Sequence, residues 1–233
     1  MTTRAEAERT GPRAVLLDSG GVLIRPVGGR WNPRADFEET VLARHPGVSA
    51  EQFARAVAAG DRFLGASSST PAPDDYHRVL LRHLGVDATP VLLAELRREV
   101  PAHTLLEVYE DVVPTLDELA RRGIRIAVVS DAWPELPALH AELGIGRYVE
   151  AYAISAVIGC TKPDPRMYHH ASGALGLAPA QCLFVDDDPA LVAAAVALGY
   201  QGRALIRDGV VPEGVPALTS LTGLLDLMPR LPG

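Results

Sequence analysis

The sequence predicts an α/β fold, in which a parallel β-sheet has helices on both faces and an all-helical segment is inserted after the first strand. Three observations lead to this prediction. Short apolar runs typical of buried strands alternate with segments of helical periodicity from residue 109 onward. Residues 24–108 have helical periodicity and little that is typical of a strand. Three apolar runs end in polar residues, where open parallel sheets bind their ligands.

The first predicted strand runs from Arg13 to Asp18 and is followed by Gly20 and Gly21. Its unbroken apolar stretch is typical of a parallel strand that is buried on both faces, and the glycines indicate a tight turn. The inserted block then shows helical periodicity in four stretches, with a loop rich in serine, alanine and proline at 65–73. The four predicted helices span 36–45, 50–64, 74–84 and 90–100.

Strands and helices alternate again after the inserted block. Proline near the start of a helix and glycine just beyond its end mark several helix boundaries, as at Pro114 and Gly123. Repeated strand–helix units form a parallel sheet that is covered on both faces. The predicted strands are 124–130, 148–154, 182–186 and 203–206, and the predicted helices are 114–122, 135–143, 165–175, 189–198 and 219–228.

Composition restricts the class of protein. The chain has 233 residues, of which 48% are hydrophobic, so it suits one medium domain or a core with an insert. A net charge of −7 argues against general affinity for nucleic acid or anionic membranes, because both bind basic surfaces. Cys160 and Cys182 have neither a disulfide pattern nor metal-ligand spacing. No signal peptide or bilayer-spanning run is recognisable, so we expect a cytoplasmic protein.

Candidate functional residues end three of the predicted strands. Asp18 ends the first apolar run, Ser130 ends a second, and the three aspartates of 186–188 end a third. Because the carboxyl ends of parallel strands meet at one edge of a sheet, these segments should converge. Lys162, the one lysine beside twenty-one arginines, stands in the loop before the predicted helix 165–175. Arginine does not replace lysine where a compact ammonium must enter a small site.

This set of residues fits phosphoryl transfer. Asp18 and Asp187 together can hold Mg²⁺, which binds a few carboxylates and completes its shell with water and substrate phosphate. Lys162 and the Ser130 hydroxyl can bind an anion beside the metal. Phosphoryl transfer depends mainly on positioning and on charge stabilisation. Asp18 is therefore the candidate nucleophile, and it would form an aspartyl-phosphate.

Four motifs, in this order along the chain, resemble those of the haloacid dehalogenase-like superfamily. The first begins at Leu17 and reads Leu-Asp-Ser-Gly-Gly-Val-Leu, and the second, Val-Val-Ser-Asp, ends at Asp131. The third begins at Lys162 and reads Lys-Pro-Asp-Pro-Arg-Met-Tyr. The fourth, Phe-Val-Asp-Asp-Asp, ends at Asp188 and precedes an alanine-rich helix. The resemblance covers residues 16 to about 199 and is highest for members with a helical cap of the C1 type.

The resemblance implies a domain division and a role for each motif residue. It implies a Rossmann-like catalytic core of residues 1–23 and 109–233 and a helical cap of residues 24–108. It also implies Mg²⁺ as the cofactor and a small phosphorylated metabolite as the substrate. The implied catalytic residues are Asp18, Ser130 and Lys162, the implied metal ligands are Asp18, the backbone carbonyl of Gly20, Asp187 and Asp186, and the candidate substrate-binding residues are Ser19, Asp131 and Arg25.

Gly20 departs from the pattern of this family. Most of its phosphatases have an aspartate two positions after the nucleophile, which acts as general acid and base. Such help is typically worth ~10²–10⁴-fold, so either another group or water supplies the proton, or phosphatase activity is weak. Some members with glycine here resemble working phosphatases of sugar phosphates. Leu191 is a second departure, because many members have an acidic residue or asparagine there, and Asp186 offers a substitute for it.

Other functions have less support in the sequence. A metal-independent 2-haloacid dehalogenase uses the same aspartate, but the acidic residues 186–188 would repel an anionic substrate if no metal were present. A phosphonate-cleaving member needs a lysine in its cap, and this chain has none there. A catalytically weak or inactive phosphate-binding module is favoured only by Gly20. The presence of Asp18 argues against it, since a protein that only binds phosphate needs no nucleophile. The cap should set specificity, and its candidate residues are Arg25, Arg30, Trp31, Arg34, His77, Arg78 and Arg82.

Overall fold

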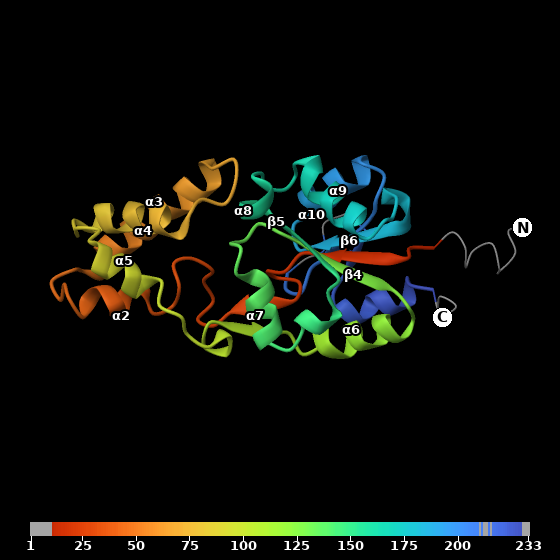
Figure 1. The fold of residues 1–233 in the computed structure, drawn as a ribbon, viewed down its shortest axis with the longest axis horizontal. Coiled ribbons are helices and arrows are strands. Elements are labelled where there is room, and N and C mark those ends of the chain that lie inside the picture. The colour runs from red at the N-terminus through yellow and green to blue at the C-terminus, as the bar shows by residue number, and fades with distance from the viewer. Residues whose placement is uncertain (1–10, 210, 212–213, 215, 230–233) are drawn as a thin grey trace, which may run out of the picture.

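A computed structural model describes residues 11–209, 211, 214 and 216–229 of the chain, and it places a sheet-based core beside a helical lobe (Figure 1). The sheet has six strands in the order β5-β4-β1-β6-β7-β8, and every neighbouring pair is parallel. The predicted α/β class is confirmed. Residues 1–10 and 230–233, at the outer ends of the predicted core, lie outside the described residues. The strands are β1 Ala14–Leu17, β4 Arg125–Ser130, β5 Ala151–Ile154, β6 Cys182–Asp186, β7 Gln201–Leu205 and β8 Ala217–Leu218.

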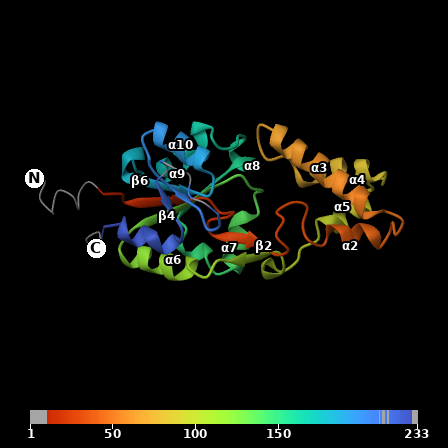
Figure 2. The same ribbon diagram turned by 180° about the vertical axis from the view of Figure 1, so that it is seen from behind.

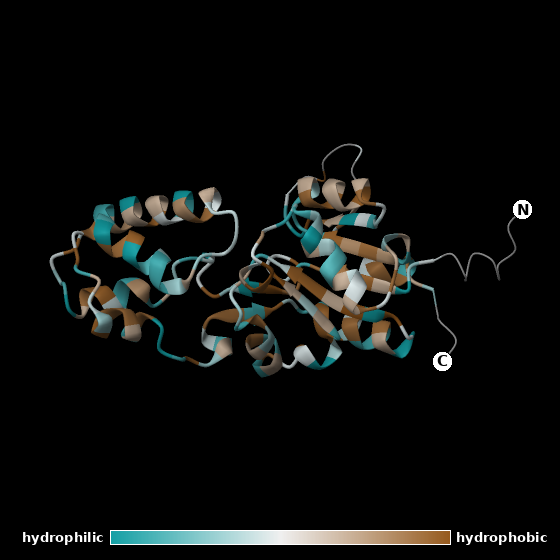
Figure 3. Ribbon diagram, turned by 45° about the horizontal axis from the view of Figure 1, so that its top comes forward, coloured by the Kyte–Doolittle hydropathy of each residue, from teal (hydrophilic) through white to brown (hydrophobic). Residues whose placement is uncertain are grey.

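Helices cover both faces of the sheet (Figure 2). Alternate residues of β1 point to opposite faces, so Val15 and Leu17 pack in the cluster that includes α6 and α7, whereas Ala14 and Leu16 pack in the cluster of α9 and α10. All four are fully buried, which explains the unbroken apolar run, and the strands are largely hydrophobic in Figure 3. The core helices are α6 Val112–Arg121, α7 Leu136–Glu142, α8 Ser155–Ile158, α9 Pro165–Ala174 and α10 Pro189–Ala197.

The lobe between β1 and β4 has a hydrophobic core of its own, which includes Phe37, Phe53, Tyr76 and Leu80. Local signals explain its two longer helices. Ser49 forms a capping box with the third residue of α3, and α4 begins with a proline and ends at a left-handed glycine. The helices of the lobe are α2 Phe37–Leu42, α3 Ala50–Ala66, α4 Pro73–Leu84 and α5 Pro90–Leu96. None of the helices in the described part of the chain is both long enough and apolar enough to cross a bilayer.

A pair of short strands at the base of the lobe corrects the prediction that residues 24–108 are all helical. β2 (Ile24–Pro26) runs antiparallel to β3 (Leu106–Val108). Each strand has three residues, and the paired positions Arg25 and Glu107 are 82 residues apart. No hairpin pattern in the local sequence therefore reveals this pairing.

The C-terminal segment also differs from the prediction. The expected helix at 219–228 is a 3₁₀-helix, Leu221–Asp226, and the two-residue strand β8 precedes it. The 3₁₀-helix begins after Ser220, whose side chain accepts a hydrogen bond from the amide of Thr222. Further 3₁₀-helices are Ala102–Thr104, Gly146–Tyr148 and Pro179–Gln181.

Candidate active site

Three of the candidate residues lie at the carboxyl ends of adjacent strands. β1 lies between β4 and β6, and Ser130 and Asp186 are the last residues of those two strands. Asp18 follows β1 directly, and its amide donates to the carbonyl of Val185 at 2.9 Å, which extends the ladder by one residue. The sheet therefore places all three residues at one edge, where parallel α/β sheets bind ligands.

The ammonium of Lys162 joins two of these strand ends. Its Nζ lies 2.8 Å from Oδ1 of Asp18 and 2.7 Å from Oδ2 of Asp186. The side chains of Lys162, Asp18 and Asp186 are 3%, 11% and 1% exposed, so bulk water screens these charges little. The backbone amide of Lys162 donates to Oδ1 of Asp131 at 3.0 Å. Asp131 therefore ties the loop that carries the lysine to the end of β4.

Burial and like charges perturb the acids of this site. Burial raises the pKa of Asp18 to about 7, although Lys162 acts in the opposite direction. Burial and the charge of Asp186 raise the pKa of Asp187 to about 6. Burial opposes the charged form of Lys162, but the carboxylates around it, Asp18 first, outweigh burial and raise the pKa of Lys162. The lysine is therefore a fixed cation, whereas Asp18 needs further positive charge to be fully ionised near neutral pH.

Three carboxylates at this edge fit a divalent cation. One oxygen each from Asp18, Asp186 and Asp187 lie within 4.8 Å of one another. Asp186 already accepts hydrogen bonds from Lys162 Nζ and from the amide of Asp188 at 2.9 Å. Asp18 and Asp187 therefore have more carboxylate oxygens free to bind a metal ion. Mg²⁺ binds few carboxylates and keeps several waters. A cation between Asp18 and Asp187 would also oppose the burial and the charge of Asp186 that raise their pKa values. The predicted role of the Gly20 carbonyl stays a prediction.

Glycine at position 21 is a steric requirement of the site. Its φ is +74°, a conformation that favours glycine, and a Cβ at this position would stand 2.1 Å from Oδ2 of Asp187. Any larger residue would push the loop after β1 away from Asp187. At Gly20 a Cβ would lie 3.0 Å from Cζ2 of Trp31, closer than ordinary contact. The indole of Trp31 therefore fills the space into which a side chain at position 20 would project.

The side chain of Ser19 is directed to a buried histidine. Its hydroxyl lies 2.8 Å from Nε2 of His140, and Nδ1 of His140 lies 3.2 Å from the hydroxyl of Tyr152. Burial lowers the pKa of His140 to about 4, so its imidazole is neutral near pH 7. Ser19 therefore anchors the loop after β1, and its hydroxyl already has a partner. His140 was not predictable from the sequence, because it is 121 residues from Ser19 and no motif surrounds it.

The buried His140 predicts an acid-sensitive contribution to stability. The folded-state pKa of about 4 lies below the ordinary value of 6.5, so the unfolded chain binds the proton more tightly. Stability is therefore lost as pH falls from about 6.5 to about 4, by roughly 3 kcal/mol for this one group. Denaturant unfolding of wild type and of His140→Gln, measured from pH 7 to pH 4, should show the advantage of wild type shrinking toward low pH. A constant difference across this range would contradict the prediction.

Arg207 also anchors this loop, and the sequence did not predict this role. Its guanidinium donates to the backbone carbonyls of Gly21 at 3.1 Å and Val22 at 2.7 Å. Two further bonds, of 2.9 and 3.0 Å, join it to the carboxylate of Asp111, and the ring of Tyr109 lies 3.8 Å from the guanidinium carbon. Such a bidentate and stacked arrangement suits arginine and not lysine. Arg207 follows β7, and no local pattern distinguishes it from the other arginines.

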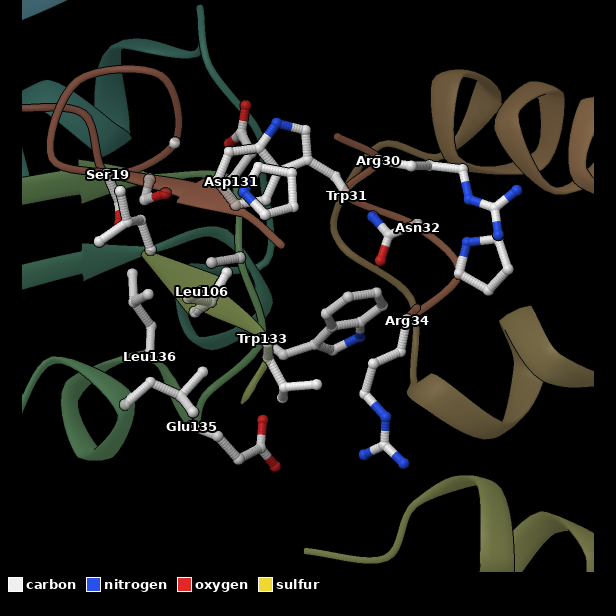
Figure 4. Close-up of a pocket in the computed structure, with 18 of the residues that line it drawn as sticks. Ser19, Arg30, Trp31, Asn32, Arg34, Leu106, Asp131, Trp133, Glu135 and Leu136 are labelled. Atoms are coloured by element: carbon white, nitrogen blue, oxygen red, sulfur yellow. The ribbon is translucent and has the colours of Figure 1, made fainter. Parts of the chain in front are cut away.

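A cavity of about 720 Å³ opens over these strand ends, between the core and the helical lobe (Figure 4). Its core side includes Asp18, Ser130 and Lys162. The remaining lining combines apolar and aromatic residues with polar ones, among them Arg30, Asn32, His77 and Glu135. Further lining residues from the core are Asp131, Trp133, Leu136, Leu139 and Asp187, and those from the lobe and its connections are Arg30, Trp31, Arg34, Tyr76, His77 and Leu106.

Arg25 is not among the residues that line this cavity, and its role as a substrate-binding residue stays a prediction. Its guanidinium pairs with Glu107 at 2.8 Å, directly across the β2–β3 ladder, and its side chain is 57% exposed. Strand alternation is the reason, since Ile24 is buried and the next residue must point to the other face. Arg30 and Arg34 do line the cavity, as expected.

Comparisons with known proteins find a matching family and several similar proteins. The model of the haloacid dehalogenase-like hydrolase family matches residues 12–199. A phosphatase of Mycobacterium tuberculosis, Phosphatase MT3486, is 33% identical over 127 residues, which are 51% of this chain and 56% of the relative. A glyceraldehyde 3-phosphate phosphatase of Methanopyrus kandleri is 31% identical over 116 residues, 47% of this chain and 48% of the relative. The matches thus span about half the length of these curated relatives.

Dehalogenases are also among the similar proteins. An (S)-2-haloacid dehalogenase of Pseudomonas sp. strain YL is 29% identical over 169 residues, 70% of this chain and 71% of the relative. The crystal structure of the L-2-haloacid dehalogenase RSc1362 superimposes with a TM-score of 0.66 at 21% identity, covering 93% of this chain and 98% of the other. A phosphatase structure from Thermococcus onnurineus has a TM-score of 0.61 at 20% identity, covering 92% and 96%. These two structures establish the shared fold.

Proposed function

The chain belongs to the haloacid dehalogenase-like hydrolases, and from this premise we propose that it is a Mg²⁺-dependent phosphatase of a small phosphorylated metabolite. The four helices α2–α5 would act as the cap over its active site. One observation carries the proposal: the chain's single ammonium, Lys162, contacts the candidate nucleophile Asp18 beside a group of carboxylates that suits a divalent cation. The names of the phosphatase relatives support the same reaction class.

In the proposed first step, a carboxylate oxygen of Asp18 attacks phosphorus while the bond to the leaving-group oxygen breaks. Lys162 and the Ser130 hydroxyl hold the phosphoryl oxygens, whose charge must be stabilised in the transition state. Lys162 also keeps the Asp18 carboxylate ionised and oriented at 2.8 Å. A bound Mg²⁺, held by Asp18 and Asp187, would supply the second positive charge beside the phosphoryl group. Water then hydrolyses the aspartyl-phosphate, which releases phosphate and restores Asp18.

The leaving group has no carboxylic acid at position 20 to protonate it, because Gly20 offers no side chain and the indole of Trp31 fills that space. The leaving oxygen must therefore take its proton from another group or from water. General acid catalysis typically contributes ~10²–10⁴-fold, and its absence slows esters of weakly acidic alcohols most. We therefore expect modest turnover that rises steeply with the acidity of the leaving group.

A 2-haloacid dehalogenase is the second candidate, because the similarity to the Pseudomonas sp. strain YL enzyme covers 70% of this chain. In that reaction, the same aspartate would attack a carbon that bears a halogen, and the substrate would carry a carboxylate. The buried Asp186 and the neighbouring Asp187 disfavour this substrate, since they would repel an anion unless a cation lies between. A cation there is the arrangement that favours phosphate esters.

One experiment separates these functions. Purified protein is incubated with p-nitrophenyl phosphate and, separately, with 2-chloropropionate, each with Mg²⁺ and with EDTA. Mg²⁺-dependent release of phosphate is the expected result. Halide release that is unaffected by EDTA would show that the protein is a dehalogenase. If neither phosphate nor halide is released, the protein would instead be a phosphate-binding module.

Removal of the metal gives a prediction about Asp187. EDTA is expected to abolish phosphate release, and Asp187→Asn should raise the Mg²⁺ concentration for half-maximal rate at least about tenfold. Because Asp18 and Asp187 must lose protons to bind the ion, and burial raises their pKa values to about 7 and 6, Mg²⁺ affinity should increase from pH 5.5 to pH 8. Titration calorimetry measures the affinity.

The matched control for this experiment is Asp117→Asn, which removes an exposed carboxylate on α6 that pairs with Arg121. It should leave Mg²⁺ affinity unchanged. Equal Mg²⁺ dependence in Asp187→Asn and in the control would show that Asp187 does not hold the metal.

A further inference from the structure

Both tryptophans of the chain line the candidate active-site cavity. Trp31 belongs to the segment between β2 and α2, and Trp133 follows β4, three residues after Ser130. Only 5% of the 233 residues are aromatic, so aromatic side chains are few in this chain and both tryptophans lie in one cavity. Tyr76 from α4 extends the aromatic wall, with its ring centroid 6.4 Å from that of Trp133 and an interplanar angle of 55°.

Trp31 brings one of these rings to the reacting centre. Its six-membered ring comes within 3.0–3.4 Å of the position that a Cβ on Gly20 would occupy, two residues after Asp18. Yet the residue is 46% exposed, so only part of the indole is covered by the loop. A large aromatic side chain that is half open at the mouth of a pocket is typical of a ligand contact.

Trp133 is held in a fixed orientation on the other side of the cavity. Its Nε1 donates to the carbonyl of Pro71 at 2.7 Å, and this bond links the loop after β4 to the segment between α3 and α4. Figure 4 shows Trp133 reaching into the cavity from the core side, whereas Trp31 enters from the side of the lobe. A fixed ring loses little conformational entropy when a second ring stacks on it.

We propose that the substrate is a phosphate ester whose leaving group carries a planar aromatic ring, and that Trp31 and Trp133 contact this ring. The inference rests on the proposed function, because a phosphoryl group held by Asp18, Ser130 and Lys162 directs the leaving group along both indoles. Hydrolysis consumes one water: the phosphorus–oxygen bond of the ester breaks, its oxygen leaves with a proton, and an aromatic alcohol and inorganic phosphate are released.

Part of the wall beside the indoles is apolar and suits a ring, although Asn32, His77 and Glu135 also line the cavity. Leu106, Leu136 and Leu139 line the cavity and cannot satisfy hydroxyl groups, each of which loses hydrogen bonds to water on burial. Arg34 is committed elsewhere, since it forms two bonds to Asp36 at 2.6 and 2.9 Å and one to the carbonyl of Arg98 at 2.9 Å. An aromatic ring needs no such partners and gains contact area with both indoles.

Two non-hydrolysable phosphonates with the same linker and the same number of ring carbons test the inference without turnover. In the presence of Mg²⁺, 2-phenylethylphosphonate should bind about five- to tenfold more tightly than 2-cyclohexylethylphosphonate, because only the planar ring can stack. The chain has two tryptophans, so each of the variants Trp31→Phe and Trp133→Phe retains a single indole. The fluorescence of each variant therefore reports ligand contact at the remaining tryptophan. The aromatic phosphonate should change the fluorescence of both variants and retain its advantage.

Trp31→Leu and Trp133→Leu, which remove the ring, should reduce the advantage of the aromatic phosphonate to twofold or less. Val91→Ala, at an exposed position of α5, is the matched control and should retain it. Equal affinity of wild type for the two phosphonates would overturn the inference, as would unchanged preference in both leucine variants. If phosphate release depends on Asp18 but the two phosphonates bind equally, the aromatic leaving group is rejected and the proposed phosphatase function stands. Aromatic preference without any phosphate release would reject the proposed function alone.

Discussion

Replacing Asp18 with asparagine is expected to reduce Mg²⁺-dependent phosphate release by about 10⁴-fold or more, because the nucleophile of the proposed reaction is lost. The amide has nearly the same shape as the carboxylate and can still accept a hydrogen bond from Lys162. The loss should therefore be chemical and not structural. Initial rates with p-nitrophenyl phosphate at saturating Mg²⁺ measure it, and beryllium fluoride should stabilise the wild type but not the variant.

Thermal unfolding supplies the control for Asp18→Asn. Burial raises the pKa of Asp18 from 3.8 to about 7, so the ionised carboxylate increasingly destabilises the folded state as pH rises through this range. Asparagine removes that charge, and the metal-free variant at pH 8 should melt at or above the temperature of wild type. A variant that keeps more than a few per cent of the wild-type rate would place the nucleophile at another residue.

Lys162→Met is expected to lower both activity and stability. The methionine leaves Asp18 and Asp186 buried without the ammonium that contacts each of them within 2.8 Å. Breaking a buried ion pair by removing one partner typically costs about 3–5 kcal/mol. Phosphate release should fall by about 10³-fold or more, since Lys162 both orients the nucleophile and stabilises charge on the phosphoryl group. Denaturant unfolding and initial rates measure the two losses separately.

The pH dependence of this stability loss tests its electrostatic origin. An acid whose folded-state pKa is raised is stabilising when protonated, so the deficit of Lys162→Met should be largest at pH 8 and shrink toward pH 4. Adding Asp186→Asn removes one of the unpaired charges and should recover stability without recovering activity. A deficit that does not change with pH would indicate lost packing in place of lost charge pairing. Lys162→Arg should not restore activity, because the bulkier guanidinium does not fit the buried position.

Residues at the ends of strands were predictable from the sequence. Asp18, Ser130 and Asp186 each end an apolar run, and the parallel arrangement of β4, β1 and β6 brings them to one edge. Lys162 was distinguished by composition, because it is the one lysine among twenty-two basic residues. Both features can be read from the sequence. The residues come close together in space because parallel strands place their carboxyl ends at the same edge of the sheet.

Side chains near the first motif have partners that the sequence did not predict. Arg25 was expected at the substrate and pairs with Glu107, whereas Ser19 directs its hydroxyl to His140. Arg207 was overlooked, although it holds the loop after β1 through a residue pair 186 positions apart. Each of these contacts is made with a residue far along the chain, and a local sequence pattern does not identify that residue.

The α/β class, the order of most strands and helices, and the acids and the lysine that meet at the sheet edge were all predictable from the sequence. These features follow from hydrophobic periodicity, which neighbouring residues specify. Three features became visible only in the folded chain: which neighbours of the motifs enter the cavity, that Trp31 fills the space over Gly20, and that Gly21 allows close approach to Asp187. The direction of a side chain depends on packing between segments that meet only after folding.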